Sequence, residues 1–308
     1  MQDIIAPVDR KVLESELTAA RFVRDTNNGH NEIYIITHHD SPNVMREIGR
    51  LREYTFRAAG GGTGHELDID EFDTADAPYK QLIVWSPEEK EIIGGYRFIK
   101  LKEAPLVNGI VHVATTELFH FSDKFMKEYV PETIELGRSF VQPKFQPSVD
   151  NRKGLFSLDN LWDGLGAIVI DNPDSKHFFG KVTMYTDFDV PARDMILAFM
   201  NYFFPDTDNL VTPLEPLQLK TDVSAFLNSI KGLSYKEAHR ILGQNVRERG
   251  EHIPPLVNAY MNLSATMKTF GTSLNSHFGE VEETGILVTI ADIYDTKKER
   301  HLATYKKR

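Results

Sequence analysis

The sequence contains no cysteine, which excludes disulfides, thiolate metal ligands and a cysteine nucleophile, and which is typical of a reducing compartment. It has no apolar run near the roughly 20 residues that cross a bilayer, and its first residues lack the basic and then apolar order of a secretion signal. We therefore expect a cytoplasmic protein. A formal net charge of -10 argues against general binding of nucleic acid.

The remaining composition is that of a globular protein. Of its 308 residues, 41% are hydrophobic and 26% are charged, which suffices for a sizeable core. We expect a single domain over residues 1–308, with a helical insertion or subdomain at residues 205–252, where short helical patterns alternate with prolines. No histidine pair has the spacing of a metal site, so no metal is expected.

Hydrophobic periodicity predicts a mixed fold of the α+β type. Residues 42–56 carry an apolar stripe at helical spacing and lead into a glycine-rich loop. Residues 80–85 and 91–101 predict two strands joined by a turn, residues 158–170 a loop that enters an apolar helix, and residues 285–293 a last strand. This order predicts a mostly antiparallel sheet with helices on both faces.

Two strand-like segments each place an arginine among apolar neighbours. One sets Glu135 and Arg138 three residues apart, and the other carries Arg97 after a pair of glycines. A buried guanidinium needs an anionic partner to offset its desolvation. These residues therefore indicate either a structural ion pair between Glu135 and Arg138 or a site for an anionic ligand.

Two weaker patterns have equally simple structural explanations. His65 precedes Asp70 by the spacing with which glycerolipid acyltransferases orient a histidine base, but the acidic residues here also suit a solvated loop. Trp162, Gly164 and Gly166 lie at the predicted start of an apolar helix, where backbone amides could approach an anion. Close packing explains such glycines as well.

Taken in order, these segments resemble the GNAT superfamily. The resemblance is to its acyl-carrier-protein-dependent N-acyltransferases, which include ornithine-lipid and glycine-lipid synthases, and more distantly to acyl-homoserine-lactone synthases. The matching positions are Arg52 near the end of the first long helix, the pair Asp70 and Asp73, the strand with Arg97, and the strand with Glu135 and Arg138.

The resemblance implies that an amine attacks an acyl thioester directly, without a covalent enzyme intermediate or a tightly bound cofactor. Glu135 is then the candidate catalytic base, because a partly buried carboxylate can have the raised pKa that an amine requires. Arg138 is the second candidate catalytic residue, and with Arg97 it either holds the carboxylate of an amino-acid acceptor or braces the acidic segment.

The resemblance also implies roles for Arg52, Asp70 and Asp73 at the substrate site, where the aspartates orient the arginines or contact the amine. The implied acceptor is a small amino acid, glycine or ornithine. The implied donor carries a long acyl chain, 3-hydroxylated in some members, and the product is an N-acyl amino acid. Residues 205–252 either enclose that chain or pack in the core.

The donor is expected to bind near Trp162, Gly164 and Gly166, where the superfamily has its pyrophosphate-binding loop. The longer glycine pattern of that loop is incomplete here. This departure favours an acyl carrier protein as donor and partner over acyl-CoA, because its single phosphate needs fewer contacts. Peripheral membrane contact is compatible with such a reaction.

Two other functions stay open. One is an O-acyltransferase that uses His65 and Asp70 on a glycerol phosphate. The other is a non-catalytic protein that keeps the GNAT fold as a ligand pocket.

Overall fold

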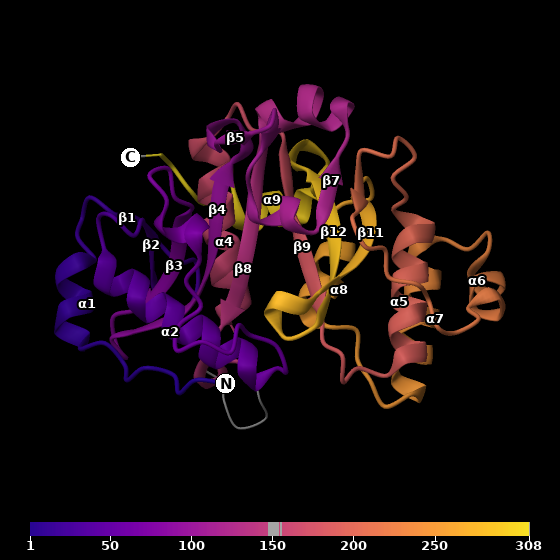
Figure 1. Cartoon of the computed structure of the whole chain (residues 1–308), viewed down its shortest axis with the longest axis horizontal. Coiled ribbons are helices and arrows are strands. Elements are labelled where there is room, and N and C mark those ends of the chain that lie inside the picture. The colour runs from indigo at the N-terminus through magenta and orange to yellow at the C-terminus, as the bar shows by residue number, and fades with distance from the viewer. Residues whose placement is uncertain (147–153, 155, 308) are drawn as a thin grey trace.

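The computed structural model describes residues 1–146, 154 and 156–307. Its centre is an eight-stranded sheet in the order β1-β2-β3-β4-β8-β9-β12-β11, in which only β8 and β9 are parallel neighbours (Figure 1). The predicted mixed, mostly antiparallel sheet is therefore confirmed. Its strands are β1 (Phe22–Asp25), β2 (Glu32–Ile36), β3 (Lys80–Ser86), β4 (Glu91–Lys100), β8 (Thr133–Val141), β9 (His177–Met184), β11 (Lys268–Asn275) and β12 (Val281–Thr289).

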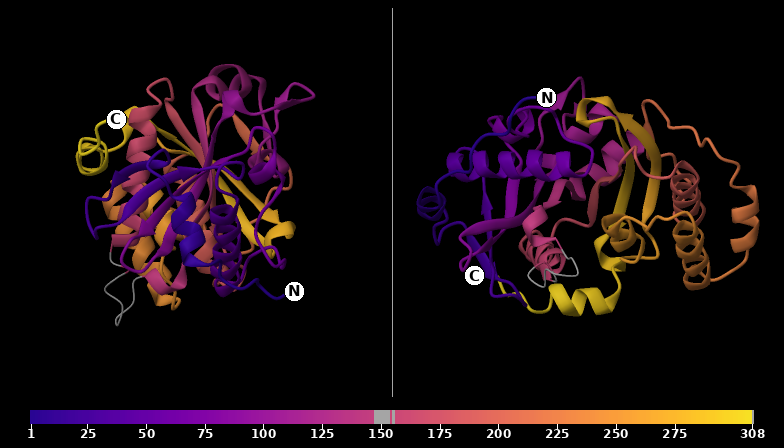
Figure 2. Two further views of the ribbon diagram at one scale, coloured as in Figure 1. Left: turned by 90° about the vertical axis from the view of Figure 1, so that its left-hand side faces the viewer. Right: turned by 90° about the horizontal axis from the view of Figure 1, so that it is seen from below.

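Helices cover both faces of the sheet (Figure 2). Helix α2 lies across one face, α4 and α9 lie on the other, and α5, α6 and α7 stand together beyond β11 (Figures 1 and 2). No helix in the described part of the chain is long and apolar enough to cross a bilayer. The helices are α1 (Arg10–Glu16), α2 (Pro42–Ala58), α3 (Glu71–Thr74), α4 (Ser157–Asp171), α5 (Val190–Phe203), α6 (Ser224–Ile230), α7 (Tyr235–Glu248), α8 (Pro255–Met261) and α9 (Asp295–His301).

The predicted insertion at residues 205–252 contains α6, α7 and the short strand β10 (Val211–Pro213), which pairs with β7 (Phe119–Phe121). Phe226 of α6 and Leu242 of α7 belong to the same buried apolar cluster as Leu82 and Leu136 of the sheet. A remaining two-stranded hairpin joins β5 (Leu106–Val107) to β6 (Ile110–Val111).

The last strand is displaced from its prediction. It runs from Val281 to Thr289 and not over residues 285–293, because a 3₁₀ turn takes up Ile290–Asp292. Its antiparallel neighbour β11 has no counterpart in the sequence-based expectation. Because the strand begins at Val281, two acidic residues, Glu282 and Glu283, lie within β12 and pair with β11.

The feature of this fold that positions a site is the separation of β8 from β9. Their parallel pairing begins at Thr133 and His177 and ends at Leu136 and Gly180. Beyond this point β8 continues to pair with β4, and β9 continues to pair with β12. Backbone groups on the facing edges thus lose their ladder partners and become available to a ligand.

Candidate active site

A β-bulge distorts β8 where the two strands separate. Arg97 of β4 stands opposite Gly137, whereas Gly95 stands opposite Phe140, so Arg138 and Ser139 together oppose one residue of β4. Arg138 has a φ of 48°, a left-handed conformation that is unfavourable for a residue with a Cβ. Backbone strain of this kind is often found at functional sites, and here it lies where β8 separates from β9.

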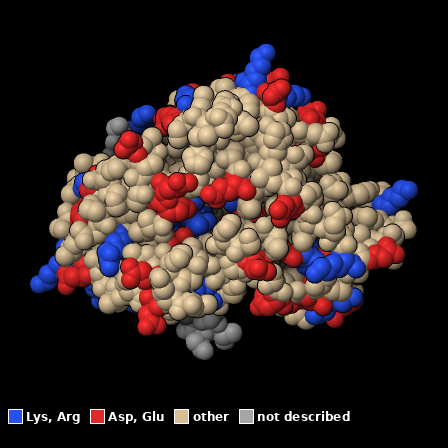
Figure 3. Space-filling view, viewed as in Figure 1, with Lys and Arg blue, Asp and Glu red and all other residues tan. Residues whose placement is uncertain are grey.

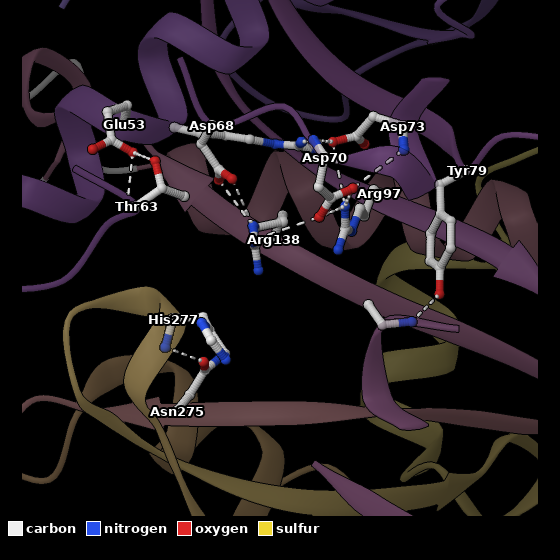
Figure 4. Close-up of polar contacts among 12 residues, drawn as sticks. Glu53, Thr63, Asp68, Asp70, Asp73, Tyr79, Arg97, Arg138, Asn275 and His277 are labelled. Carbon is white, nitrogen blue, oxygen red and sulfur yellow. Dashed lines mark hydrogen bonds and ion pairs between the residues drawn. The ribbon is translucent and has the colours of Figure 1, made fainter. Parts of the chain in front are cut away.

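The arginines of the predicted site meet three aspartates above this bulge (Figure 4). Arg138 Nε donates to both carboxylate oxygens of Asp68, at 3.1 and 2.8 Å. Arg97 Nη1 donates to both oxygens of Asp70 at 2.7 Å and lies 3.3 Å from Asp73 Oδ2. The arginines therefore brace the acidic segment, which is one of the two roles that the sequence left open for them.

Arg52 completes the network from α2. Its Nη1 donates to Asp73 Oδ2 at 3.0 Å, and its Nη2 donates to Gln81 Oε1 at 2.5 Å. Asp70 and Asp73 cap α3 reciprocally, so the acidic segment is a short helix and its N-terminus, not a solvated loop. Three arginines and three aspartates balance in charge, and the side chains of Arg52 and Asp73 are fully buried. We call Arg52, Arg97, Arg138, Asp68, Asp70 and Asp73 the arginine–aspartate network.

The network keeps its members ionised. Burial works to raise the pKa of Asp73, but the guanidiniums of Arg52, Arg97 and Arg138 hold it far below its ordinary value. Burial works to lower the pKa of Arg97, but Asp70 and Asp73 hold it well above its ordinary value. Figure 3 shows acidic side chains gathered around basic ones at the centre of this face of the molecule.

Glu135 is not part of this network and does not pair with Arg138. Its Oε1 accepts a hydrogen bond of 2.7 Å from Thr115 Oγ1. Its Oε2 is buried and has no hydrogen bond of good geometry among the described residues, although the nearby hydroxyl of Tyr79 helps to lower the pKa of the carboxyl. Burial raises the pKa of Glu135, against the opposing effects of Thr115, Lys181 and Arg97. The side chain is 1% exposed. The prediction of a structural ion pair between Glu135 and Arg138 is therefore wrong.

Sequence reasoning missed a second polar group beside Glu135. Lys181 of β9 lies 2.9 Å from Glu283 Oε2 on β12, and Asn275 of β11 donates to the same oxygen at 3.0 Å. Burial works to raise the pKa of Glu283, but Lys181 holds it below its ordinary value. Asn275 and Glu283 lie on consecutive strands, but Lys181 is about a hundred residues away in the sequence, so no local spacing relates it to them.

A narrow cavity lies between the separated strands. Tyr96, Arg138 and Lys181 line it, together with Leu256 and Tyr260 of α8. Its volume of about 30 Å³ is that of one water molecule. A pantetheine arm therefore requires α8 or the strands to move apart. Within the described ranges, no three acidic or histidine side chains form a metal-binding group.

Trp162, Gly164 and Gly166 are not at a helix start. Helix α4 begins at Ser157, so all three lie in its interior, where backbone amides are used by the helix itself. A Cβ on Gly164 would lie 2.7 Å from the Leu82 side chain, and one on Gly166 would lie 2.4 Å from the carbonyl oxygen of His301. The prediction that these residues start a helix and bind the phosphate of the acyl donor there is therefore wrong. Close packing against β3 and α9 explains the two glycines.

This packing gives a first prediction. Gly166→Ala should lower the free energy of unfolding by roughly 1 to 3 kcal/mol, because the backbone of His301 cannot move aside easily. Gly164→Ala should have a smaller effect, since the side chain of Leu82 can rotate. Urea denaturation measures both values. A stable Gly166→Ala variant with a raised KM for the acyl donor would restore the donor-binding role.

His65 and Asp70 do not form a catalytic pair. The carboxylate of Asp70 is held by Arg97, and no hydrogen bond joins it to the exposed ring of His65 anywhere in the described chain. The backbone carbonyl of His65 accepts a hydrogen bond from Arg57. Asp70 therefore caps helix α3 and binds Arg97, and it does not orient His65 as a base.

Comparison with known proteins assigns this arrangement to a family. Residues 51–150 match the acetyltransferase (GNAT) domain model. The chain is 52% identical over 308 residues to the glycine N(alpha)-acyltransferase of Phocaeicola vulgatus, covering 100% of this chain and 94% of that protein. It is a GNAT-family N-acyltransferase. The glycine N(alpha)-acyltransferase of Bacteroides thetaiotaomicron is 54% identical over 310 residues, which cover 99% of this chain and 91% of the relative.

Among solved structures, this N-acyltransferase is similar to a CoA-dependent acyl-homoserine lactone synthase, at 12% identity and a TM-score of 0.38, covering 88% of this chain and 89% of that one. Membership of the family makes the protein an enzyme. Neither the non-catalytic ligand-binding hypothesis nor the O-acyltransferase hypothesis is retained.

Proposed function

We propose that this N-acyltransferase transfers a long, 3-hydroxylated acyl chain from an acyl carrier protein thioester to the amine of glycine. The observation that carries the proposal is the full-length identity of 52% and 54% to two proteins named glycine N(alpha)-acyltransferase. At this identity and coverage, the acceptor is expected to be shared. Glycine is accordingly preferred over ornithine.

The reaction forms a C–N bond and breaks the C–S bond of the thioester. The nitrogen of glycine loses two protons, of which one passes to Glu135 and the other leaves with the thiol. Glu135 is the proposed base because its Oε2 has no hydrogen bond of good geometry within the described residues, and because burial raises its pKa, which brings it closer to that of an amine. The separation of β8 from β9 is the proposed place of the thioester, where free backbone N–H groups can contact the developing oxyanion.

Arg52, Arg97, Asp70 and Asp73 are proposed to act at the substrate site by fixing the position of Arg138 and the wall around it. This role is supported by their mutual hydrogen bonds. Residues 205–252 are proposed as the helical insertion, and the packing of α6 and α7 on the sheet core suits a structural role as well as a wall for an acyl chain.

The choice of donor is supported by the interior position of Gly164 and Gly166, which leaves this helix without the glycine cradle expected for a pyrophosphate. Acyl carrier protein presents a single phosphate on its pantetheine arm. It is therefore the proposed partner, in a cytoplasmic reaction with peripheral membrane contact at the stage of the product.

The proposal is tested by mixing the protein with glycine and either acyl carrier protein thioesters or matched acyl-CoA thioesters, each with and without a 3-hydroxyl group. Released thiol reports turnover, and the absence of cysteine from the chain removes its own background. We expect thiol release with glycine and the carrier-protein thioester, together with an N-acylglycine in the mass spectrum. Faster turnover with acyl-CoA would refute the donor, and faster turnover with ornithine would refute the acceptor.

A further inference from the structure

The turn between β11 and β12 closes the site on the side facing Arg138. The backbone N–H of His277 donates to Asn275 Oδ1 at 3.2 Å, and Phe278 is buried. A Cβ on Gly279 would lie 2.8 Å from the Cα of Gly61, so the turn is in tight contact with the glycine-rich loop after α2. This turn is a rigid support and not a free loop.

The side chain of His277 lies at the surface of this turn. Its ring makes no hydrogen bond with any residue of the described chain. Figure 4 shows His277 on the turn that faces the segment with Arg138. The ring of the next residue, Phe278, stacks under Arg138 with its centroid 4.3 Å from the guanidinium carbon, which fixes the two segments as neighbours.

Arg138 has unused hydrogen-bonding capacity toward the same space. Its Nε is bound by Asp68 and its Nη2 lies 3.6 Å from Asp70, while its Nη1 has no partner in the described part of the protein. Three carboxylates near Arg138 are engaged, since Glu283 is held by Lys181, and Asp68 and Asp70 belong to the arginine–aspartate network. Arg138 Nη1 and the N–H of the His277 ring are donors that no described residue uses, and such donors suit an anion.

We propose that Arg138 Nη1 and the ring of His277 bind the carboxylate of the amino-acid acceptor from opposite sides. This inference rests on the proposed function, because it requires an acceptor that carries a carboxylate next to its amine. His277 is then a positioning residue: it fixes the second carboxylate oxygen and so restricts the orientations open to the amine. The rigid turn makes this contact available without reordering of the chain.

The experiment compares glycine with glycinamide, which has the amine but no carboxylate, in wild type and His277→Ala. We expect His277→Ala to raise the KM for glycine by roughly 10- to 100-fold, since a hydrogen bond to a charged group is lost. The kcat should stay within about threefold, and the KM for glycinamide should not change. His277→Gln, which keeps one donor, should restore part of the loss. Ser276→Ala, an exposed neighbour in the same turn, is the matched control.

An unchanged KM for glycine in His277→Ala would overturn the inference, and so would equal increases for glycine and glycinamide. A wild-type enzyme that acylates another amino acid but not glycine would refute the acceptor named under Proposed function. The same comparison, made with that amino acid and its amide, would then decide the role of His277. Absence of any amine acylation by the wild type would refute both proposals.

Discussion

Glu135→Gln is expected to lower kcat by roughly 10² to 10⁴-fold, the usual contribution of a general base. Glutamine keeps the shape of the side chain and can still accept from Thr115, but it cannot take a proton from the amine. Steady-state kinetics with saturating glycine and donor measures the effect. Glu132→Gln is a suitable control, because that carboxylate is paired with Lys176 on the surface and should leave kcat unchanged.

The raised pKa of Glu135 also predicts two pH effects. Activity should rise with pH as Glu135 ionises, with an apparent pKa above the ordinary 4.5, and this rise should be absent from any residual activity of Glu135→Gln. Between 4.5 and the raised value, the folded state holds the proton that the unfolded state has released, so stability should fall with increasing pH over that window. Glu135→Gln removes this fall.

A purely structural Glu135 would give a different pattern. Glu135→Gln would then keep nearly full kcat, and the pH–rate profile would match that of the wild type. Thermal denaturation at pH 7 separates this case from simple misfolding, because a variant that keeps the wild-type melting temperature is folded.

Arg52→Met is expected to lower the free energy of unfolding by about 3 to 5 kcal/mol. The substitution leaves the fully buried Asp73 without its nearest guanidinium and with the more distant Arg97 as its remaining cation, and breaking a buried ion pair is strongly destabilising. Urea denaturation followed by circular dichroism measures the loss. The matched control is Arg10→Met, which removes an exposed partner of Glu91 and should change stability by less than about 1 kcal/mol.

The double variant Arg52→Met/Asp73→Asn sharpens this test. If the loss arises from the stranded charge of Asp73, neutralising that carboxylate should recover a substantial part of it. A loss from Arg52→Met no larger than that from Arg10→Met would show that the network contributes little to folding.

The strands with Arg97 and Glu135 could be predicted from the sequence because charged residues stand out within apolar runs of period two. The partners of these residues could not. Arg138 contacts Asp68 and not Glu135, because the bulge gives it a left-handed backbone that no residue pattern announces. Lys181 lies beside Glu135 because β9 pairs in parallel with β8. That pairing depends on how the chain between the two strands crosses over, which the local sequence does not show.

The glycines illustrate the opposite error. Glycine near an apolar stretch predicts a helix start around Gly164, yet α4 begins earlier, at Ser157, and its glycines make close contact with Leu82 and His301. Glycine near a helix indicates either a backbone site for anions or a place without room for a side chain, and only the neighbours decide. The sequence does not single out His277 for a related reason. An exposed histidine in a polar turn has no characteristic pattern, and only the fold brings its neighbour Phe278 against Arg138.

The contact between Gly61 and Gly279 has a consequence for any attempt to change what this enzyme accepts. Glu53 holds the first of these loops through the backbone of Thr63 and Gly64, and the second carries His277. The two loops thus form one unit built from opposite ends of the chain. Transplanting either loop alone from a relative should fail by collision, whereas exchanging both together offers a route to new acceptors.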